Sequence, residues 1–359
     1  MDTSLHSGLV EVNLAALKSN WLKLKAAAHG AEIAAAIKGE AYGLGLSPCA
    51  KALWEAGCRS YYVARPGEGE ALRAILADAN ITVLDGLYPD QSAYYVKHRL
   101  IPAITTPAQA LEWAQQAQGA PCTLHVDTGI NRLGLSIAEY AQILKDHPKL
   151  NIAFVLSHLA CSEEPEHPMN EAQRKRFEDV RALAPHIKGS FANSSGILLN
   201  KSFAHDQVRP GVALYGGNPL PGRANPMAVV ATLKARVLQI RDLNAGETLG
   251  YSATWAAQGP TRIALLGAGY RDGVPRKLSS SEHKGPAQVF LNGKRCPIVG
   301  RVSMDMMAAN ITGANAKLGD WAEIFGPNIP VDEAAAWAGT ISYELLTHLG
   351  SRYARHYAD

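Results

Sequence analysis

The sequence lacks any run of about 18 apolar residues, so it contains no candidate for a membrane-spanning helix. Residues 1–10 lack the basic and apolar segments of a secretory signal peptide. Cysteine is scarce: there are 5 in 359 residues, and no two are spaced C-x-x-C. This scatter is not typical of a disulfide framework or a zinc site. These absences predict a cytoplasmic protein with reduced thiols and no bound metal.

A strong charge of either sign is also missing. The chain has 35 Lys and Arg residues against 32 Asp and Glu residues, which gives a formal net charge of +3. Such a balance is too mild to indicate a nucleic-acid partner or a membrane surface. The composition is 47% hydrophobic, so a chain of this length can bury a large core.

Strand-like and helix-like segments alternate through the first two thirds of the chain. Amphipathic runs follow an opening helical pattern at residues 14–28, and they cover residues 47–56, 67–76, 107–116, 136–145 and 170–183. Eight apolar segments alternate with them, at residues 32–37, 60–64, 81–85, 101–105, 123–126, 152–157, 189–192 and 207–212. The alternation predicts an α/β fold with a parallel sheet. Eight repeats favour a (β/α)8 barrel of the TIM type, although the spacing alone leaves an open doubly wound sheet possible.

The pattern changes after residue 216. The segment G-G-N-P-L-P-G-R-A-N-P is typical of a loop. Beyond it, Asn292 and Gly293 form a hairpin-turn signal between two short strands. The apolar residues now alternate with a period of two, in residues 230–240, 261–266, 289–291, 296–299 and 321–325. We therefore expect a second, mainly β domain with short helices near its end.

Lys38 comes directly after the first barrel strand. In a parallel barrel the carboxyl ends of the strands carry the active site. A lysine there either reaches solvent or is a desolvated amine that forms a Schiff base. Taken alone, the residue leaves both interpretations open.

Polar residues and glycines follow four more of the predicted strands. An arginine after a strand can bind a carboxylate by two parallel hydrogen bonds. A lone histidine in such a place is more often a packing residue. Small polar residues and glycine after strands seven and eight suit a phosphate site. The residues concerned are Arg132, His158, Asn193, Ser194, Arg209 and Gly211.

The segments in order resemble the alanine racemases, a fold-type III pyridoxal-5′-phosphate family. The resemblance runs from about Ile33 to the C-terminus, through A-I-K-G-E-A-Y-G-L-G, V-D-T-G-I-N-R-L-G, S-H-L-A-C-S, A-N-S-S-G, V-R-P-G-V-A-L-Y-G, G-Y-S-A-T-W, G-Y-R-D-G and G-R-V-S-M-D. It implies a homodimer in which a barrel (residues 13–222) precedes a mainly β domain (223–359). Residues 1–12 would return as a strand to the β domain.

The resemblance also implies roles for the residues of the barrel. Lys38 would hold pyridoxal 5′-phosphate as a Schiff base, and Arg209 would face the pyridine nitrogen with support from His158. Arg132 would lie near the phenolic oxygen of the cofactor and the carboxylate of the substrate. The phosphate would be held by Tyr42, Ser194 and the backbone N–H groups of Gly211 and Val212.

Further residues would come from the second subunit. Tyr251 would oppose Lys38 across the substrate Cα, so that the two groups interconvert L-alanine and D-alanine as a pair of bases. Arg132 and an imidazolium would favour the ionised phenol. The Met304 N–H would meet the substrate carboxylate. Accessory positions would be Asn193 and, on the path of the substrate, Tyr270 and Asp305.

The chain departs from the family pattern at three places. Leu44 replaces a common histidine, and His125 stands where many members carry a carbamylated lysine. Ser351 replaces a tyrosine that binds phosphate in some members, with Tyr353 close by. The alternatives are a racemase of serine, of a basic amino acid or of broad specificity, a fold-type III decarboxylase, or a non-catalytic cofactor-binding protein. A biosynthetic and a catabolic role remain equally open.

Overall fold

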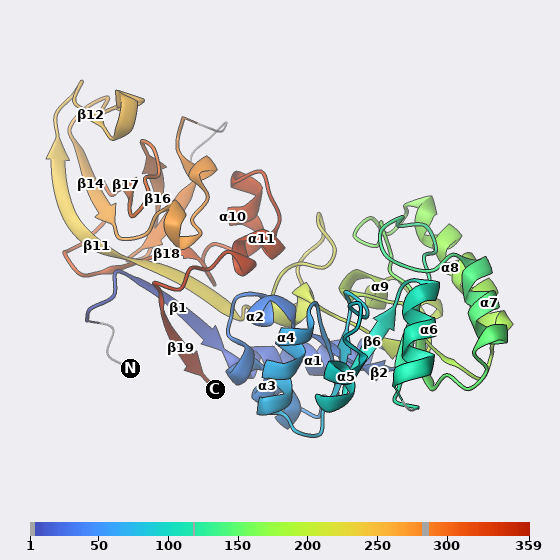
Figure 1. Ribbon diagram of the computed structural model, residues 1–359. Helices are drawn as coiled ribbons and strands as arrows, with labels where there is room; N and C mark the ends of the chain where they lie inside the picture. The colour runs from blue at the N-terminus through green and yellow to red at the C-terminus, as the bar shows by residue number, and fades with distance from the viewer. Residues whose placement is uncertain (1–3, 118, 282–286) are drawn as a thin grey trace. The chain divides into compact units, whose positions relative to one another are not determined.

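The computed structural model describes residues 4–117, 119–281 and 287–359, and it divides into two compact units. The barrel unit comprises Leu17–Leu214 and Asn218–Met227. The β unit combines the described residues up to Ala16 with Tyr215–Gly217 and Ala228–Asp359. In Figure 1 the barrel unit is coloured mainly from blue to yellow and the β unit mainly from yellow to red.

The barrel unit is built on a parallel sheet that closes on itself. Its order is β2-β10-β9-β8-β7-β6-β5-β4-β3. Only Ala34 separates β2 from β3, and the N–H groups of Ala34 and Ala36 donate to Val208 and Pro210 at 2.9 Å, so β2 and β3 are halves of one strand. The predicted eight-stranded (β/α)8 barrel is therefore confirmed, with strands β2 (Glu32–Ile33), β3 (Ala35–Ala36), β4 (Ser60–Val63), β5 (Asn80–Val83), β6 (Leu100–Ile104), β7 (Cys122–His125), β8 (Ile152–Leu156), β9 (Lys188–Ser190) and β10 (Gln207–Val208).

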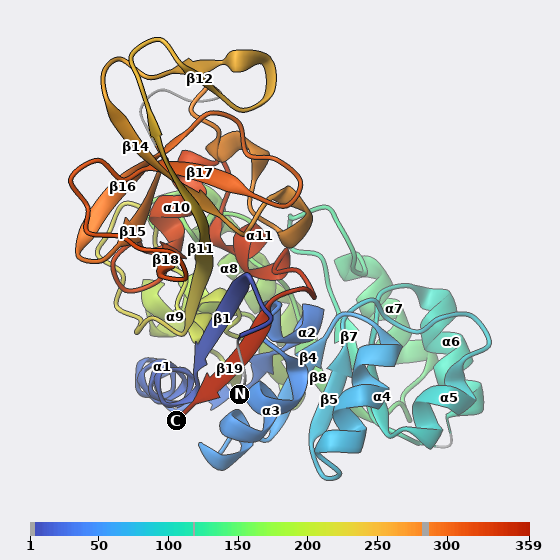
Figure 2. The same cartoon turned by 90° about the vertical axis from the view of Figure 1, so that its left-hand side faces the viewer.

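Helices surround these strands, as the two views show (Figures 1 and 2). Several of these helices begin at residues that favour the start of a helix. Thr106 and Ser136 accept hydrogen bonds from the third residue of their helices, and Pro66 and Pro107 occupy first helical positions. The sequence missed the short α5 and α9. The helices are α1 (Leu14–Ala27), α3 (Leu46–Glu55), α4 (Pro66–Ile75), α5 (Ser92–Lys97), α6 (Pro107–Gln116), α7 (Ile137–Asp146), α8 (Pro168–Leu183) and α9 (Ser194–Leu199).

The last two barrel strands are shorter than predicted. The expected segments 189–192 and 207–212 contain only β9 and β10. Pro210 has no N–H to donate and only accepts a hydrogen bond, from Ala36, so regular strand pairing ends before it. The residues released from the ladder form the loops that carry Asn193, Ser194 and Gly211.

The β unit is organised around the 13-residue strand β11 (Ala231–Leu243). This strand pairs with β1 (Gly8–Asn13), β14 (Thr261–Leu266) and β18 (Trp321–Phe325). Residues 231–237 of β11 alternate between buried and half-buried, as a strand with one covered face should. β1 (Gly8–Asn13) lies between β11 and the C-terminal β19 (Ala354–Ala358). Asn292 and Gly293 both have positive φ (47° and 83°), which confirms the predicted tight hairpin between β15 and β16.

The remaining elements of the β unit complete its sheet and its C-terminal helices, and the predicted mainly β architecture is confirmed. They are β12 (Thr248–Leu249), β13 (Trp255–Ala256), β14 (Thr261–Leu266), β15 (Gln288–Leu291), β16 (Lys294–Val299), β17 (Met307–Asn310), β18 (Trp321–Phe325), α10 (Val331–Trp337) and α11 (Ser342–Thr347).

Within the described part of the chain, no helix combines the length and apolar character needed to cross a membrane. The same residues contain no group of three or more His, Cys, Asp or Glu side chains arranged to hold a metal ion.

Candidate functional site

Lys38 opens a left-handed turn at the carboxyl end of the first barrel strand. This turn, α2 (Lys38–Tyr42), has φ of 61°, 57°, 56° and 55° at residues 39–42. Left-handed geometry costs a residue with a Cβ roughly 1–2 kcal/mol, and only Gly39 escapes that cost. Backbone hydrogen bonds from Ala41 to Ile37 and from Gly43 to Gly39, at 3.0 and 2.8 Å, stabilise the turn. The neighbourhood of Lys38 therefore adopts a costly conformation that other contacts must hold.

Glu68 supplies the main contact from another element. Its Oε1 accepts the Gly39 N–H at 2.7 Å, and its Oε2 accepts the Ala64 and Arg65 N–H groups at 2.7 and 3.1 Å. One carboxylate thus fixes the residue next to Lys38 and also caps α4. The role of Glu68 was not predicted from the sequence, although Pro66 followed by Glu68 is a local signal for the start of a helix.

The amine of Lys38 lies among charged groups at the mouth of the barrel. Lys38 is exposed in the single chain. Even so, partial desolvation of the amine, and then the positive charge of Arg132, hold its pKa below the ordinary value, against the opposing effects of Glu68 and Asp85. A lowered pKa makes the neutral, reactive form of the amine more available.

Arg132 lies on a closed loop after β7. Asp127 Oδ1 accepts the N–H groups of Gly129 and Ile130 at 2.7 and 3.0 Å. The loop is closed at its base, where Leu135 N–H donates to the His125 carbonyl at 2.8 Å and Asp127 N–H donates to the Leu135 carbonyl at 2.9 Å. The exposed Arg132 side chain is thus presented from an anchored backbone.

Arg209 lies buried inside the barrel, where its guanidinium is fixed by several acceptors. Nη1 donates to Ser190 Oγ at 2.7 Å, and Nη2 donates to the Ser157 carbonyl at 2.5 Å. The guanidinium also lies over the ring of Tyr62, 5.6 Å from its centroid. Burial lowers the pKa of Arg209, but an arginine remains cationic at neutral pH.

Two histidines share this region, and their surroundings disfavour the charged form of both. Burial, followed by Arg209 and Arg132, lowers the pKa of His125 to about 4 and that of His158 well below its usual value. Neither histidine therefore favours the imidazolium form that the sequence led us to expect near Tyr251. Within the described chain both ring nitrogens of the buried His125 lack a hydrogen-bond partner. An unpaired buried imidazole indicates a position that a bound molecule or water completes.

A cradle of donors and small residues lies after β9 and β10. Ser194 Oγ accepts the N–H groups of Gly211 and Ala213 at 2.9 and 3.3 Å. A Cβ added at Gly211 would lie 2.3 Å from the Tyr42 hydroxyl, so the backbone at residue 211 and this hydroxyl are immediate neighbours. Burial raises the pKa of Tyr42, which keeps its hydroxyl protonated and able to donate. Val212 is buried at the start of the 3-10 turn Val212–Tyr215.

Asn193 caps α9 instead of pointing to solvent. Its Oδ1 accepts the Gly196 N–H at 2.9 Å and the Ser162 hydroxyl at 3.0 Å. Asn193 therefore fixes the backbone that presents Ser194.

The other candidate residues lie on exposed loops of the β unit. Tyr251 is 70% exposed and Met304 is 51% exposed, and Tyr270 and Asp305 are also open to solvent. The loops of Tyr270 and Met304 are neighbours, because the N–H groups of Tyr270 and Arg271 donate to the carbonyls of Ser303 and Met304 at 3.0 Å. Exposed apolar side chains gathered on adjacent loops are typical of an interaction surface.

Three further positions singled out in the sequence are placed as follows. Leu44 is fully buried in the barrel unit. Ser351 is exposed, whereas Tyr353 is buried in the β unit, where a Cβ at Gly8 would lie 2.3 Å from its ring. In the β unit Tyr353 is thus a packing residue.

Comparisons with known proteins agree with this geometry. Residues 12–219 match the model of the alanine racemase N-terminal domain, and residues 230–357 match that of the C-terminal domain. The chain belongs to the alanine racemase family. It is 43% identical to an alanine racemase of Methylobacterium nodulans, over 99% of this chain and 98% of that protein.

Solved alanine racemases have the same fold. The enzyme of Bartonella henselae, whose structure contains covalently bound pyridoxal phosphate, is 35% identical with a TM-score of 0.92, over 98% of this chain and 99% of that one. The enzyme of Acinetobacter baumannii is 30% identical with a TM-score of 0.92, over 99% and 100% of the two chains.

The barrel mouth fits pyridoxal phosphate, the cofactor of the family. The Ser194 hydroxyl, the Gly211 backbone and the Tyr42 hydroxyl lie close together, and hydroxyl and backbone N–H groups of this kind suit a phosphate. An amine of lowered pKa suits an aldehyde. Both ring nitrogens of His125 lack a hydrogen-bond partner among the described residues, which suits a position beside a bound polar molecule.

Replacing Gly211 with alanine is expected to weaken the binding of pyridoxal phosphate at least about 10-fold. The new methyl group would overlap the Tyr42 hydroxyl at 2.3 Å and displace a phosphate donor. The measurement is the dissociation constant of the cofactor, by absorbance titration of the apoprotein. Gly67→Ala is the matched control, because a Cβ there meets nothing within 4 Å. Equal cofactor affinity in both variants would contradict the assignment of the cradle.

Proposed function

We propose that this chain is an isomerase that interconverts L-alanine and D-alanine with pyridoxal 5′-phosphate, using Lys38 and Tyr251 as the two bases. The observation that carries the proposal is the position of Lys38 at the carboxyl end of the barrel strands, together with the cluster of Tyr42, Ser194 and Gly211. The membership in the alanine racemase family supports the reaction and the substrate class.

The bound cofactor supplies the electron sink that an acidic Cα–H requires. The protein supplies binding and proton transfer. Tyr42, Ser194 and the backbone of Gly211 and Val212 would hold the phosphate, and Arg209 would face the pyridine nitrogen. An arginine in that place cannot hand a proton to the ring, which restrains side reactions such as transamination.

Lys38 would hold the cofactor through its side-chain amine, and the same amine would act as one base at the substrate Cα. Tyr251 acts as the other base from the opposite face. Arg132 and the Met304 N–H bind the substrate carboxylate and keep the Cα–H bond aligned with the two bases. A positioned acid or base contributes about 10²- to 10⁴-fold to the rate.

The second base belongs to another copy of the chain in this proposal. Tyr251 and Met304 of the partner subunit complete each site, so the active unit is a homodimer. The support is the exposed set of loops in the β unit, where apolar side chains would otherwise face water.

A reducing compartment such as the cytoplasm suits the thiols. All five cysteines are free. Burial raises the pKa of Cys49 and Cys122 to about 12 and that of Cys58 to about 11, so these thiols stay protonated and unreactive.

The deciding experiment is an absorbance spectrum of the purified protein, followed by racemisation assays over a panel of L-amino acids that includes alanine, serine and lysine. We expect a band from covalently held cofactor and the highest kcat/KM for alanine. A cofactor band with turnover highest for serine or lysine would favour a related racemase. A band without turnover of any amino acid would favour a non-catalytic cofactor-binding protein.

A further inference from the structure

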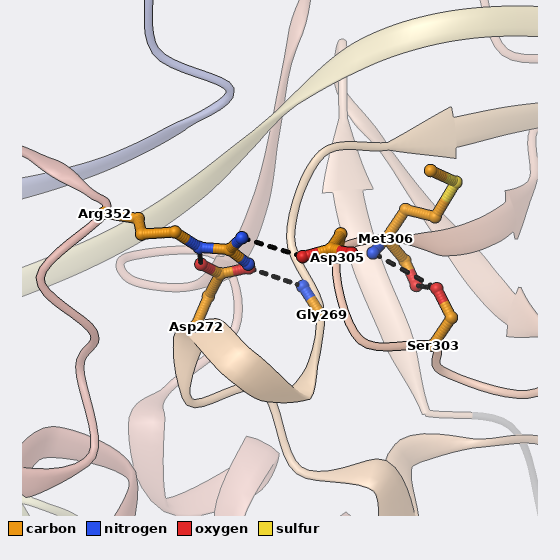
Figure 3. A network of polar contacts seen from close by, with 6 residues as sticks. All are labelled: Gly269, Asp272, Ser303, Asp305, Met306 and Arg352. Carbon is orange, nitrogen blue, oxygen red and sulfur yellow. Dashed lines mark hydrogen bonds and ion pairs between the residues drawn. The ribbon is translucent and has the colours of Figure 1, made fainter.

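A single guanidinium joins two carboxylates in the β unit (Figure 3). Arg352 Nε and Nη2 donate to the two oxygens of Asp272 at 2.6 and 2.8 Å, and its Nη1 donates to Asp305 Oδ1 at 2.7 Å. The Asp272 side chain is only 6% exposed, whereas the other two are about half exposed. Two-pronged arginine–carboxylate pairs fix direction as well as distance.

Asp272 also organises the backbone around it. Its Oδ2 accepts the Gly269 N–H at 3.0 Å, and its carbonyl accepts the Gly350 N–H at 3.0 Å. The backbone of Gly269 packs closely against that of Ser303, because a Cβ at Gly269 would lie 2.4 Å from the Ser303 carbonyl oxygen. Three segments distant in sequence therefore pack closely, namely residues 269–273, 303–306 and 348–352.

The middle segment is the loop that carries Met304. The loop closes on itself, because Ser303 N–H and Oγ both donate to the Met306 carbonyl, at 2.9 and 2.7 Å. The Met304 carbonyl accepts the Arg271 N–H at 3.0 Å. Among the described residues no acceptor faces the Met304 N–H, so this donor is available to a ligand.

We propose that Arg352 is a positioning residue for substrate: by gripping Asp305 while anchored on buried Asp272, it holds the Met304 N–H in place for the substrate carboxylate. The inference rests on the proposed function and adds a residue to it. Asp305 adjoins Met304 within the loop that the Ser303–Met306 hydrogen bonds close, so fixing Asp305 restricts the movement of the Met304 N–H. Asp272 anchors Arg352, because loss of the Arg352 guanidinium would leave the buried Asp272 carboxylate unpaired.

The inference predicts a specific kinetic pattern. A weaker hold on the carboxylate affects binding of substrate more than the proton transfers, which Lys38 and Tyr251 perform. Asp305→Ala releases only the loop and leaves the Asp272–Arg352 pair intact. We therefore expect an approximately 10-fold higher KM for alanine in Asp305→Ala, with kcat changed less than about 3-fold. Arg352→Met should show at least the same rise in KM, and Arg352→Lys should lie between it and the wild type.

Propanoate, the substrate without its amine, gives a readout that does not depend on turnover. Its affinity, measured by calorimetry on the cofactor-loaded protein, should fall about 10-fold in Asp305→Ala and Arg352→Met. The matched control is Arg295→Met, which breaks another two-pronged pair of the β unit, with Glu333 at 2.6 and 2.9 Å. This control should keep the wild-type KM and propanoate affinity, whatever its melting temperature.

The outcomes distinguish a failure of the role of Arg352 from a failure of the proposed function. An active wild type whose Asp305→Ala and Arg352→Met variants keep the wild-type KM and propanoate affinity would overturn the role of Arg352 and leave the proposed function standing. A wild type that racemises no amino acid would overturn the proposed function itself.

Discussion

Lys38→Ala is expected to lower the turnover of both L-alanine and D-alanine by at least about 10³-fold, the largest loss that any single barrel substitution should give. The variant loses the covalent attachment of the cofactor and one of the two bases together. The Lys38 side chain makes no hydrogen bond or ion pair with the described residues, so its removal should leave the fold intact.

The measurements are kcat in both directions and the absorbance spectrum of the cofactor-loaded variant. We expect free pyridoxal phosphate to replace the covalent species in the spectrum. An added small amine should restore part of the activity, because it can replace the missing nitrogen. Lys51→Ala is the matched control, since Lys51 is exposed on α3. If Lys38→Ala kept a tenth or more of the wild-type turnover, Lys38 would not be the residue that holds the cofactor.

The sequence was sufficient for the parts of the fold that depend on local patterns. Apolar segments separated by amphipathic runs predicted the barrel, and Asn292-Gly293 predicted a tight hairpin because two positive φ angles suit asparagine and glycine. Lys38 could be selected because the carboxyl ends of parallel strands collect at one edge of the barrel. Each of these predictions rests on patterns formed by residues that are neighbours in the chain.

The sequence was insufficient where geometry depends on distant residues. Glu40, Ala41 and Tyr42 have no local preference for left-handed backbone, and the turn is fixed partly by Glu68 from another element. Arg352 and Asp272 are 80 positions apart, so no spacing rule could pair them. The lowered pKa of His158 follows from burial beside Arg209 and Arg132, which only the folded barrel brings together.

Tyr251→Phe is expected to give the loss of activity that best tests a mechanism with two bases. With one base removed, exchange of the Cα proton should fall about 10²- to 10⁴-fold from one enantiomer and much less from the other, because Lys38 still serves its own face. The measurement follows deuterium incorporation into each enantiomer of alanine separately. Tyr357→Phe on β19 is the matched control. Equal losses from both enantiomers would contradict a mechanism with two bases.

The same variant tests which subunit supplies the phenol. Lys38→Ala and Tyr251→Phe dimers are each nearly inactive, and they can be mixed, dissociated and reassembled in equal amounts. If Tyr251 serves the partner's site, every hybrid dimer contains one site with both bases intact. Half of the dimers would be hybrids, so the mixture should regain about a quarter of the wild-type activity. If Tyr251 instead serves the barrel of its own chain, each site in the hybrid still lacks one base and no activity returns. The size of the recovery therefore decides between a site shared by two chains and a site completed within one.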